Sequence, residues 1–224
     1  MNSKHLLLSA STFGLLTALS IVSSSISTHA KPLSPARIAT SAQPIKQQTN
    51  TPSISDNSQD FIKDIAERGI GFMANQELSK EAREKEFRKM LEESFDMKTI
   101  GRFALGKYWR IATKEQKKEY LDLFENMIVN VYSRRFGDYN GENFEVISSR
   151  AQGTADAIVA SQIIPGSGAT ISVDWRVRKK NQQFVVIDII VAGVSMALTQ
   201  RSDFSAVIQR GGGKIDVLLE HLRK

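Results

Sequence analysis

The chain contains few of the side chains that enzymes use as nucleophiles or metal ligands. It has no cysteine and three histidines, His5, His29 and His221. The first two fall in an N-terminal segment with the features of a removable signal peptide, so one histidine remains. His221 lies near the end of the last expected helix, where the helix dipole favours a cation. Ser-His and Cys-His pairs and histidine-ligated metal sites therefore lack the residues they need, and we expect no metal and no cofactor.

One carboxylate stands out because its surroundings are apolar. Asp188 is the only polar residue in the run Phe184–Val191, and a buried carboxylate is unfavourable unless it is hydrogen-bonded or paired. One interpretation is an enzyme on a cone-shaped curled-sheet fold, with Asp188 as general base on a hydrophobic substrate. The other is structural, with Asp188 paired to Arg176 or Arg178 of a neighbouring strand. Ser195 has no base partner, and we interpret it as a structural hydroxyl.

The same run, Phe184–Val191, predicts a central β-strand, because both faces of an almost wholly apolar strand must be covered. Gly193 ends this strand. Ser202 and Asp203 then predict the cap of a short helix, which Gly211 ends. One face of the strand can pack on a core, which leaves the other free to wall an apolar cavity.

The length and composition predict one sizeable globular domain, since 41% of the 224 residues are hydrophobic and 24% are charged. Residues 1–30 combine a positively charged start, an apolar run over residues 6–22 and small residues at the end, the pattern of a cleaved secretory signal peptide. An uncleaved membrane anchor is the alternative. Residues 31–58 are rich in Ser, Thr, Pro and Gln and predict a flexible tether, which leaves residues 59–224 as the domain.

Export and charge restrict the partners. An exported chain without cysteine must fold without disulfides, which favours a bacterial periplasm. The formal net charge of +6 favours anionic partners, including lipid head groups. The basic residues occur in small clusters with little aromatic interleaving, so binding to nucleic acid is disfavoured.

Helical periodicity covers the first half of the domain. It predicts a helix from about Gln59, a charged helix capped by Ser79 and a short helix capped by Asp96. The capping box Thr113–Gln116 then begins a long helix that ends near Arg135. Its apolar face is wide, so we expect the sheet to curl around it.

Alternation with a period of two begins near Asn143 and predicts four strands. Short connections make them an antiparallel meander, and helices followed by strands indicate the α+β class. We therefore expect N-terminal helices packed on a twisted antiparallel β-sheet meander that encloses an apolar pocket, followed by C-terminal helices. The expected strands are Phe144–Ser149, Ala155–Ile164, Thr170–Arg178 and Phe184–Val191, and the last helix is Ile215–Leu222.

Motifs spread over the domain carry a family resemblance. They are Gly101–Arg110 with Ala112, Thr113 and Gln116, then Tyr139–Gly141, Asp174–Arg176, Gly193–Met196 and Thr199–Phe204. In this order they resemble the MlaC family, the periplasmic phospholipid-binding component of the Mla transport system, also called the toluene-tolerance family. The resemblance covers about Phe61 to the C-terminus.

The resemblance implies a mixed α+β domain whose deep apolar pocket takes the acyl tails of a glycerophospholipid and leaves the head group outside. It implies a carrier with no catalytic residues and no metal, whose bound phospholipid is cargo. It further implies exchange of lipid with an outer-membrane lipoprotein complex and with an inner-membrane ABC transporter complex that includes a hexameric lipid-binding subunit. A hopanoid-type cargo is the alternative.

We expect the pocket lining to come from the helices and from the concave face of the sheet. Because the orientation of the last strand is open, either Val186 with Ile190 or Ile187 with Ile189 faces the cavity. The other lining candidates are Phe103, Leu105, Trp109, Phe124, Ile128, Val131, Ile171, Val173, Trp175, Val194 and Met196.

A phosphate at the mouth of such a pocket needs cations nearby. We expect Arg102, Lys107 and Arg110 in the vicinity of the head group, because guanidinium and ammonium groups form charge-assisted hydrogen bonds with phosphate. Ordinary exposed surface is the alternative for each of them.

Overall fold

The structure is a computed structural model and describes residues 54–224. The signal peptide expected at residues 1–30 lies outside the described residues, as does all but the end of the tether expected at residues 31–58. That end is helical, because α1 spans Ile54–Ala74 and begins before its predicted start. Asp56 in the first turn favours this start, since negative charge stabilises a helix N-terminus.

The next three helices begin at the caps that the sequence predicts. Ser79, Asp96 and Thr113 each accept a hydrogen bond from a backbone N–H in the first turn of the helix that follows. The Gln116 side chain completes the capping box by accepting a hydrogen bond from the Thr113 N–H at 3.1 Å. The helices are α2 (Lys80–Ser94), α3 (Met97–Leu105) and α4 (Lys114–Ser133), and the 3₁₀ turn η1 (Gly106–Arg110) joins the last two.

One antiparallel sheet contains the strands in chain order, β1-β2-β3-β4-β5. All four strands predicted from alternation are present, so the meander and the α+β class are confirmed. The strands are β1 (Asn143–Gln152), β2 (Asp156–Ile164), β3 (Ile171–Lys180), β4 (Gln183–Val191) and the short β5 (Val194–Ser195).

A β-bulge decides which side chains of β4 face the core. The register of β3 with β4 shifts between Arg176 and Val177, which leaves Ile187 as an extra residue. Val186 and Ile189 consequently pack against the same hydrophobic core. Neither pairing expected from strict alternation describes this strand, because the bulge reverses the alternation halfway along it.

The last two helices are α5 (Met196–Arg210) and α6 (Ile215–Leu222). The prediction that Ser202 and Asp203 cap a helix is wrong, since both lie inside α5. Ser195 takes the cap position, and its hydroxyl accepts a hydrogen bond from the Leu198 N–H at 3.1 Å. The chain therefore passes from β4 through β5 into α5 with almost no loop.

Buried apolar side chains form two clusters. The sheet-side core lies between the sheet, α1 and α2 and includes Ile62 and Val186. The helical core lies among α3, α4, α5 and α6 and includes Phe204 and Leu218. Ile128 of α4 packs against both clusters, so the domain has a sheet half and a helical half that meet along α4.

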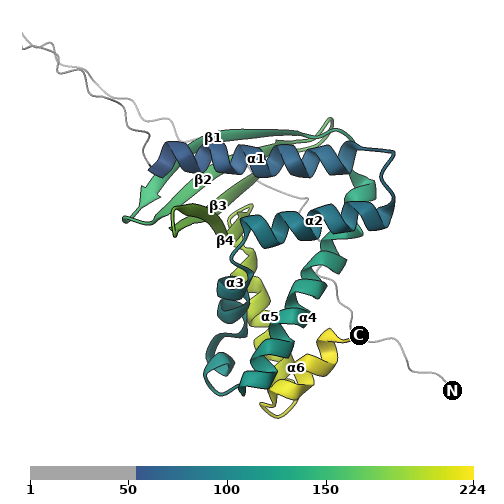
Figure 1. Cartoon of the computed structure of the whole chain (residues 1–224), viewed down its shortest axis with the longest axis vertical. Helices are drawn as coiled ribbons and strands as arrows, with labels where there is room; N and C mark the ends of the chain where they lie inside the picture. Colours follow the sequence, from purple (N-terminus) through teal and green to yellow (C-terminus); the bar gives the residue numbers. More distant parts are fainter. Residues whose placement is uncertain (1–53) are drawn as a thin grey trace, which may run out of the picture. The chain divides into compact units, whose positions relative to one another are not determined.

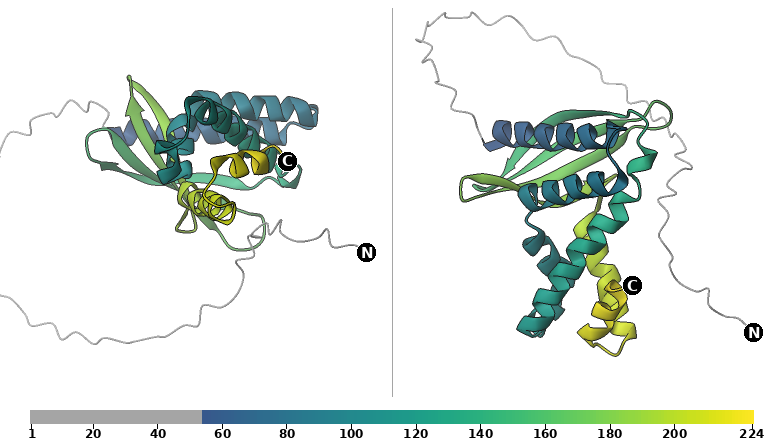
Figure 2. Two further views of the ribbon diagram at one scale, coloured as in Figure 1. Left: turned by 90° about the horizontal axis from the view of Figure 1, so that it is seen from below. Right: turned by 45° about the vertical axis from the view of Figure 1, so that its right-hand side comes forward.

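The helix that covers the sheet is α1, which lies along β1 and β2 with α2 beside it (Figure 1). The expectation that the sheet curls around the long helix after Thr113 is wrong. Helix α4 runs away from the sheet and packs against α6, α2 and α3 (Figure 2). Because α1 supplies Ile62 and Ile65 as apolar cover, α4 contributes little more than Ile128 and Val129 to the sheet-side core, and much of its apolar face contacts other helices.

Candidate functional site

An apolar pocket of about 210 Å³ lies where the sheet-side core and the helical core meet. Five helices and two strands supply its lining, so no single element builds it. Tyr132, which is 41% exposed, indicates that the pocket reaches the surface beside α4. The lining residues are Ile65, Phe87, Met90, Leu91, Phe95, Met97, Ile100, Phe124, Ile128, Tyr132, Trp175, Asp188, Ile189, Met196 and Ala197.

Asp188 is the one charged side chain of this lining. Its carboxylate accepts hydrogen bonds from the Ser195 hydroxyl at 2.7 Å and from the Ala197 N–H at 3.1 Å. The expected ion pair with a strand arginine is absent from the described part of the chain. Arg178 instead binds Asp156, with distances of 2.7 and 2.8 Å. Asp188 and Ser195 thus hold the start of α5 against β4.

Helix α3 is fixed closely on α4. The buried Tyr120 hydroxyl donates a hydrogen bond to the Gly101 carbonyl at 2.9 Å, and burial raises the pKa of Tyr120, which keeps this donor protonated. Gly101 allows the close approach, because a Cβ there would lie 2.8 Å from Cδ2 of Leu121 and 3.1 Å from Cδ1 of Phe124. The wall that α3 gives the apolar pocket is therefore firmly positioned.

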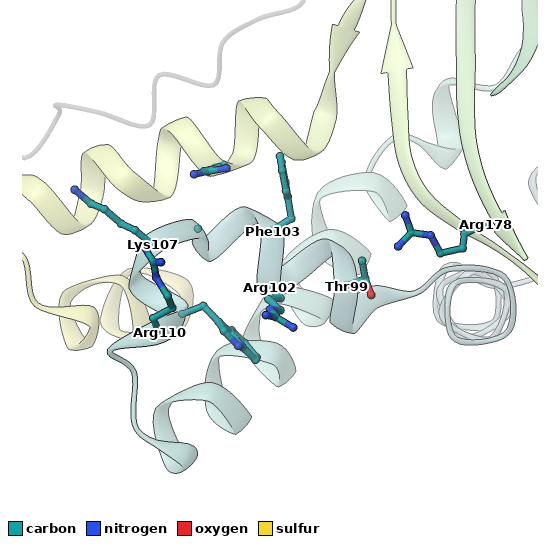
Figure 3. Close-up of a pocket in the computed structure, with 9 residues that line it drawn as sticks. Thr99, Arg102, Phe103, Lys107, Arg110 and Arg178 are labelled. Carbon is teal, nitrogen blue, oxygen red and sulfur yellow. The ribbon is translucent and has the colours of Figure 1, made fainter. Parts of the chain in front are cut away.

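A second hollow, of about 540 Å³, lies on the other side of α3 (Figure 3). Met97 and Ile100 face the apolar pocket, whereas Thr99 and Arg102 line this hollow, and their spacing places the two pairs on opposite sides of the helix. We call it the basic groove. Its lining, which contains no acidic residue, is Thr99, Arg102, Phe103, Gly106, Lys107, Trp109, Arg110, Arg178 and Arg201.

The expected site residues divide between these two hollows. Those that line the apolar pocket are Phe124, Ile128, Trp175, Ile189 and Met196. Those that line the basic groove are Phe103 and Trp109, together with the expected head-group residues Arg102, Lys107 and Arg110. The three cations line one groove, which α3 separates from the apolar pocket.

The remaining expected lining residues lie in neither hollow. Leu105, Val173 and Val186 are buried in the hydrophobic interior. Val131, Ile171 and Val194 are between 41% and 50% exposed. Ile187 and Ile190 are half-buried and line neither the pocket nor the groove.

Helix α2 supplies much of the lining that the sequence analysis did not assign to a pocket. Phe87, Met90, Leu91 and Phe95 recur at helical spacing, so the signal was present in the sequence. The same stripe equally predicts packing against a sheet, and α2 does contact β4. Periodicity marks the buried face of a helix but does not show whether that face meets a cavity.

The chemistry of the described residues is limited in two further respects. Among residues 54–224, no group of three or more His, Cys, Asp or Glu side chains is placed to hold a metal ion. No helix within those residues combines the length and apolar character required to cross a bilayer.

An α+β fold with a pocket of this kind defines a small binding domain with an apolar cavity. The chain belongs to the MlaC family, whose model, described as MlaC protein, matches residues 63–224. The resemblance carried by the sequence motifs is thereby confirmed.

Individual relatives agree with this assignment. The toluene tolerance protein ttg2D of Pseudomonas putida is 25% identical over 114 residues, which cover 51% of this chain and 53% of that protein. The intermembrane phospholipid transport system binding protein MlaC of Haemophilus influenzae is 23% identical over 133 residues, which cover 58% of this chain and 61% of that protein. This chain thus spans between half and two thirds of the length of the curated relatives it matches.

A solved structure shares the fold. It is the phospholipid-binding protein of Ralstonia solanacearum in complex with a phospholipid, with a TM-score of 0.64 and 22% sequence identity. The similarity covers 74% of this chain and 94% of that one. At this identity the comparison establishes the architecture of the domain.

Proposed function

We propose that this protein binds a phospholipid by its acyl chains in the apolar pocket. The observation that carries the proposal is the lining, in which the only charged group, Asp188, already accepts hydrogen bonds from Ser195 and Ala197. Such a surface offers a hydrocarbon chain much the same environment as a membrane interior. Membership of the MlaC family and the Ralstonia protein solved with a phospholipid support this choice of ligand.

The energetics explain why a carrier is needed. Moving acyl chains into water is unfavourable by about 0.8 kcal/mol per methylene, so two chains face a barrier on the order of 20 kcal/mol. An apolar pocket removes most of this barrier. Because the bilayer does the same, transfer between bilayer and pocket is nearly balanced, and partner proteins can set its direction.

The pocket must widen to hold such a ligand. Its volume of about 210 Å³ is below the roughly 300–1,000 Å³ of sites for small molecules. Its lining comes from both cores, with Phe87 and Leu91 on one side and Phe124 on the other. Separating the two halves would enlarge the pocket without opening the centre of either core, and Ile128 lies at the joint.

In the finer form of this proposal, the protein is a periplasmic shuttle without catalysis. It exchanges phospholipid with an outer-membrane lipoprotein complex and with an inner-membrane ABC transporter complex that includes a hexameric lipid-binding subunit. The name of the Haemophilus relative, an intermembrane phospholipid transport system binding protein, supports this role. The signal peptide expected at residues 1–30 supports the compartment.

The direct test is extraction of lipid from the full-length protein purified from cells, followed by mass spectrometry. We expect a glycerophospholipid in the extract, and a hopanoid in its place would change the cargo but not the mechanism. Protein that is empty and also takes up no lipid from vesicles would contradict the proposal.

A matched pair of variants assigns the lipid to the pocket. Ile128→Trp places a larger side chain in the pocket and should reduce the lipid content at least about fivefold. Ile147→Trp, at a position that is 54% exposed on β1, should leave it unchanged. Thermal unfolding shows whether each variant is folded. If the Ile128→Trp protein is unfolded, Ile189→Phe is a smaller substitution in the same pocket. Normal lipid content in a folded pocket variant would exclude this pocket as the lipid-binding site.

A further inference from the structure

The basic groove concentrates positive charge in a lining that contains no acid among the described residues. Arg102, Lys107 and Arg110 come from α3 and η1, and Arg178 reaches in from β3 (Figure 3). Arg201 comes from α5. No aspartate or glutamate lines the groove. Because like charges repel, an anion bound in the groove would be stabilised by these cations, to an extent that salt reduces.

Only one of these cations is neutralised by the protein itself. Arg178 forms its two hydrogen bonds with Asp156. No ion pair within residues 54–224 involves Arg102, Lys107, Arg110 or Arg201. All four are exposed, so their charged groups can reach a ligand in the groove.

The groove is preorganised by an aromatic ring and a glycine. The Arg201 guanidinium lies over the Phe103 ring, 5.2 Å from its centroid. Gly106 has φ +60°, and a Cβ there would lie 2.8 Å from Nε of Arg201. The absence of a side chain at Gly106 therefore lets Arg201 lie across the turn that follows α3.

The shape and the aromatic content of the groove favour a polypeptide ligand. Phe103, which is 43% exposed, and Trp109 both line the groove, and the Lys117 ammonium lies 5.6 Å from the centroid of the Trp109 ring. A recess that combines cations and aromatic faces suits a protruding segment with carboxylates and an apolar side chain.

We propose that the basic groove docks an acidic segment of a partner protein, one that carries an apolar side chain among its carboxylates. The inference rests on the proposed function, because a carrier that exchanges lipid must dock on its donor and its acceptor. The chain itself does not supply such a segment in its expected tether, since Asp56 is the only acidic residue of residues 31–58. Since α3 separates the groove from the apolar pocket, docking leaves the cargo in place.

The test uses a short fluorescent peptide of aspartate and glutamate with two leucines, and its Asn/Gln counterpart as the uncharged control. The double variant Arg102→Ala, Arg110→Ala should bind the acidic peptide about tenfold more weakly than the unchanged protein, because charge-assisted hydrogen bonds are lost. The double variant Lys85→Ala, Lys89→Ala removes the same charge from exposed positions of α2 and should bind within about twofold of it.

Three outcomes would overturn the docking proposal. The first is equal weakening in both double variants, which would mean that only net charge matters. The second is a groove variant that binds the acidic peptide normally but loses binding to phosphatidylglycerol vesicles, which would assign the groove to a membrane surface. The third is self-association of the protein that the groove variant abolishes, which would assign it to a second copy of the chain.

Lipid content of the same preparations separates this inference from the proposed function. We expect the groove variant to carry as much lipid as the unchanged protein. Loss of lipid together with loss of peptide binding would assign the groove to the cargo head group and overturn the docking proposal. If the protein without substitutions carries no lipid, the proposed function is contradicted. The peptide-binding results would still show whether the basic groove is a docking site. Thermal unfolding shows whether the groove variant is folded. If the double variant is unfolded, the single substitution Arg102→Gln replaces it.

Discussion

The apolar pocket and the basic groove share one wall, helix α3, and differ in almost every other property. The pocket has apolar side chains and a single carboxylate that accepts hydrogen bonds from within the protein. The groove has cations from three parts of the chain and no carboxylate. A helix of nine residues can serve both because its side chains point to opposite sides every two residues or so. If the two proposals hold, cargo and partner are bound independently, although the two sites are close.

The two sites also differ in how firmly their walls are held. The pocket lies at the joint between two cores, and in the proposed function it widens when they separate. The groove is held by the turn at Gly106 and by Arg201, whose guanidinium lies over the Phe103 ring, so it keeps its shape while exposed to water. In the two proposed roles, flexibility belongs to the site that would admit a large apolar ligand, and preorganisation to the site that would recognise charge.

The largest effect is expected where the shared wall is displaced. Gly101→Leu places a side chain against Leu121 and Phe124, and we expect a loss of about 3 kcal/mol in the free energy of unfolding. Lipid content and acidic-peptide binding should both fall, because α3 lines both sites. Gly71→Leu is the control, since a Cβ at Gly71 meets nothing within 4 Å. Urea unfolding measures the difference, and equal stability of the two variants would contradict the close packing of α3 on α4.

A smaller effect, confined to the apolar pocket, is expected at Asp188. Asp188→Ala leaves the Ala197 N–H and the Ser195 hydroxyl without their acceptor, which should lower the free energy of unfolding by about 2 kcal/mol. Lipid content should fall, since Met196 and Ala197 line the pocket at the start of α5. Acidic-peptide binding should not change.

Two companion variants sharpen the result at Asp188. Asp203→Ala removes an exposed carboxylate from helix α5 and should leave the free energy of unfolding almost unchanged. Asp188→Asn keeps an acceptor for the Ala197 N–H and should recover part of the stability. A folded Asp188→Asn protein that binds lipid normally but loses a hydrolytic or isomerase activity would favour the general-base interpretation.

The smallest effect is expected at the ion pair beside the groove. The hydrogen bonds from Arg178 hold the pKa of Asp156 below its usual range. A lowered pKa means that the pair stabilises the fold above the unfolded-state value of about 3.9 and that this contribution is lost as the pH falls through the folded-state value. Asp156→Asn should therefore lower the free energy of unfolding at pH 7 by up to about 1 kcal/mol and have less effect in strong acid.

Urea unfolding at neutral and acidic pH measures this difference, with Asp203→Asn as the matched control. At high salt, neither variant should raise the affinity of the basic groove for the acidic peptide, because salt screens exposed charges equally in both variants. A deficit of Asp156→Asn that is the same at both pH values would contradict the assignment.

Much of the fold could be predicted because its signals are local. The caps at Ser79, Asp96 and Thr113 are satisfied within one turn, and each fixes a helix start by itself. The strands follow from alternation over a few residues. The start of α5 was predicted wrongly although its cap is also local, since Ser195 accepts a hydrogen bond from the Leu198 N–H. Asp188 of β4 adds a distant acceptor for the Ala197 N–H, and Ser202 and Asp203 have no capping role.

The sequence by itself determined the α+β class, the apolar faces of the helices, the shortage of catalytic side chains and the family. Only the tertiary structure decided which apolar faces meet a cavity and which meet each other. The bulge at Ile187 and the path of α4 away from the sheet set those partners, and neither is encoded in a short window. The cations at Arg102, Lys107 and Arg110 were visible in the sequence, but the orientation of α3 placed them on the side opposite the apolar pocket. The physical reason is that periodicity specifies a side chain's direction relative to its own element, whereas a binding site depends on how several elements pack together.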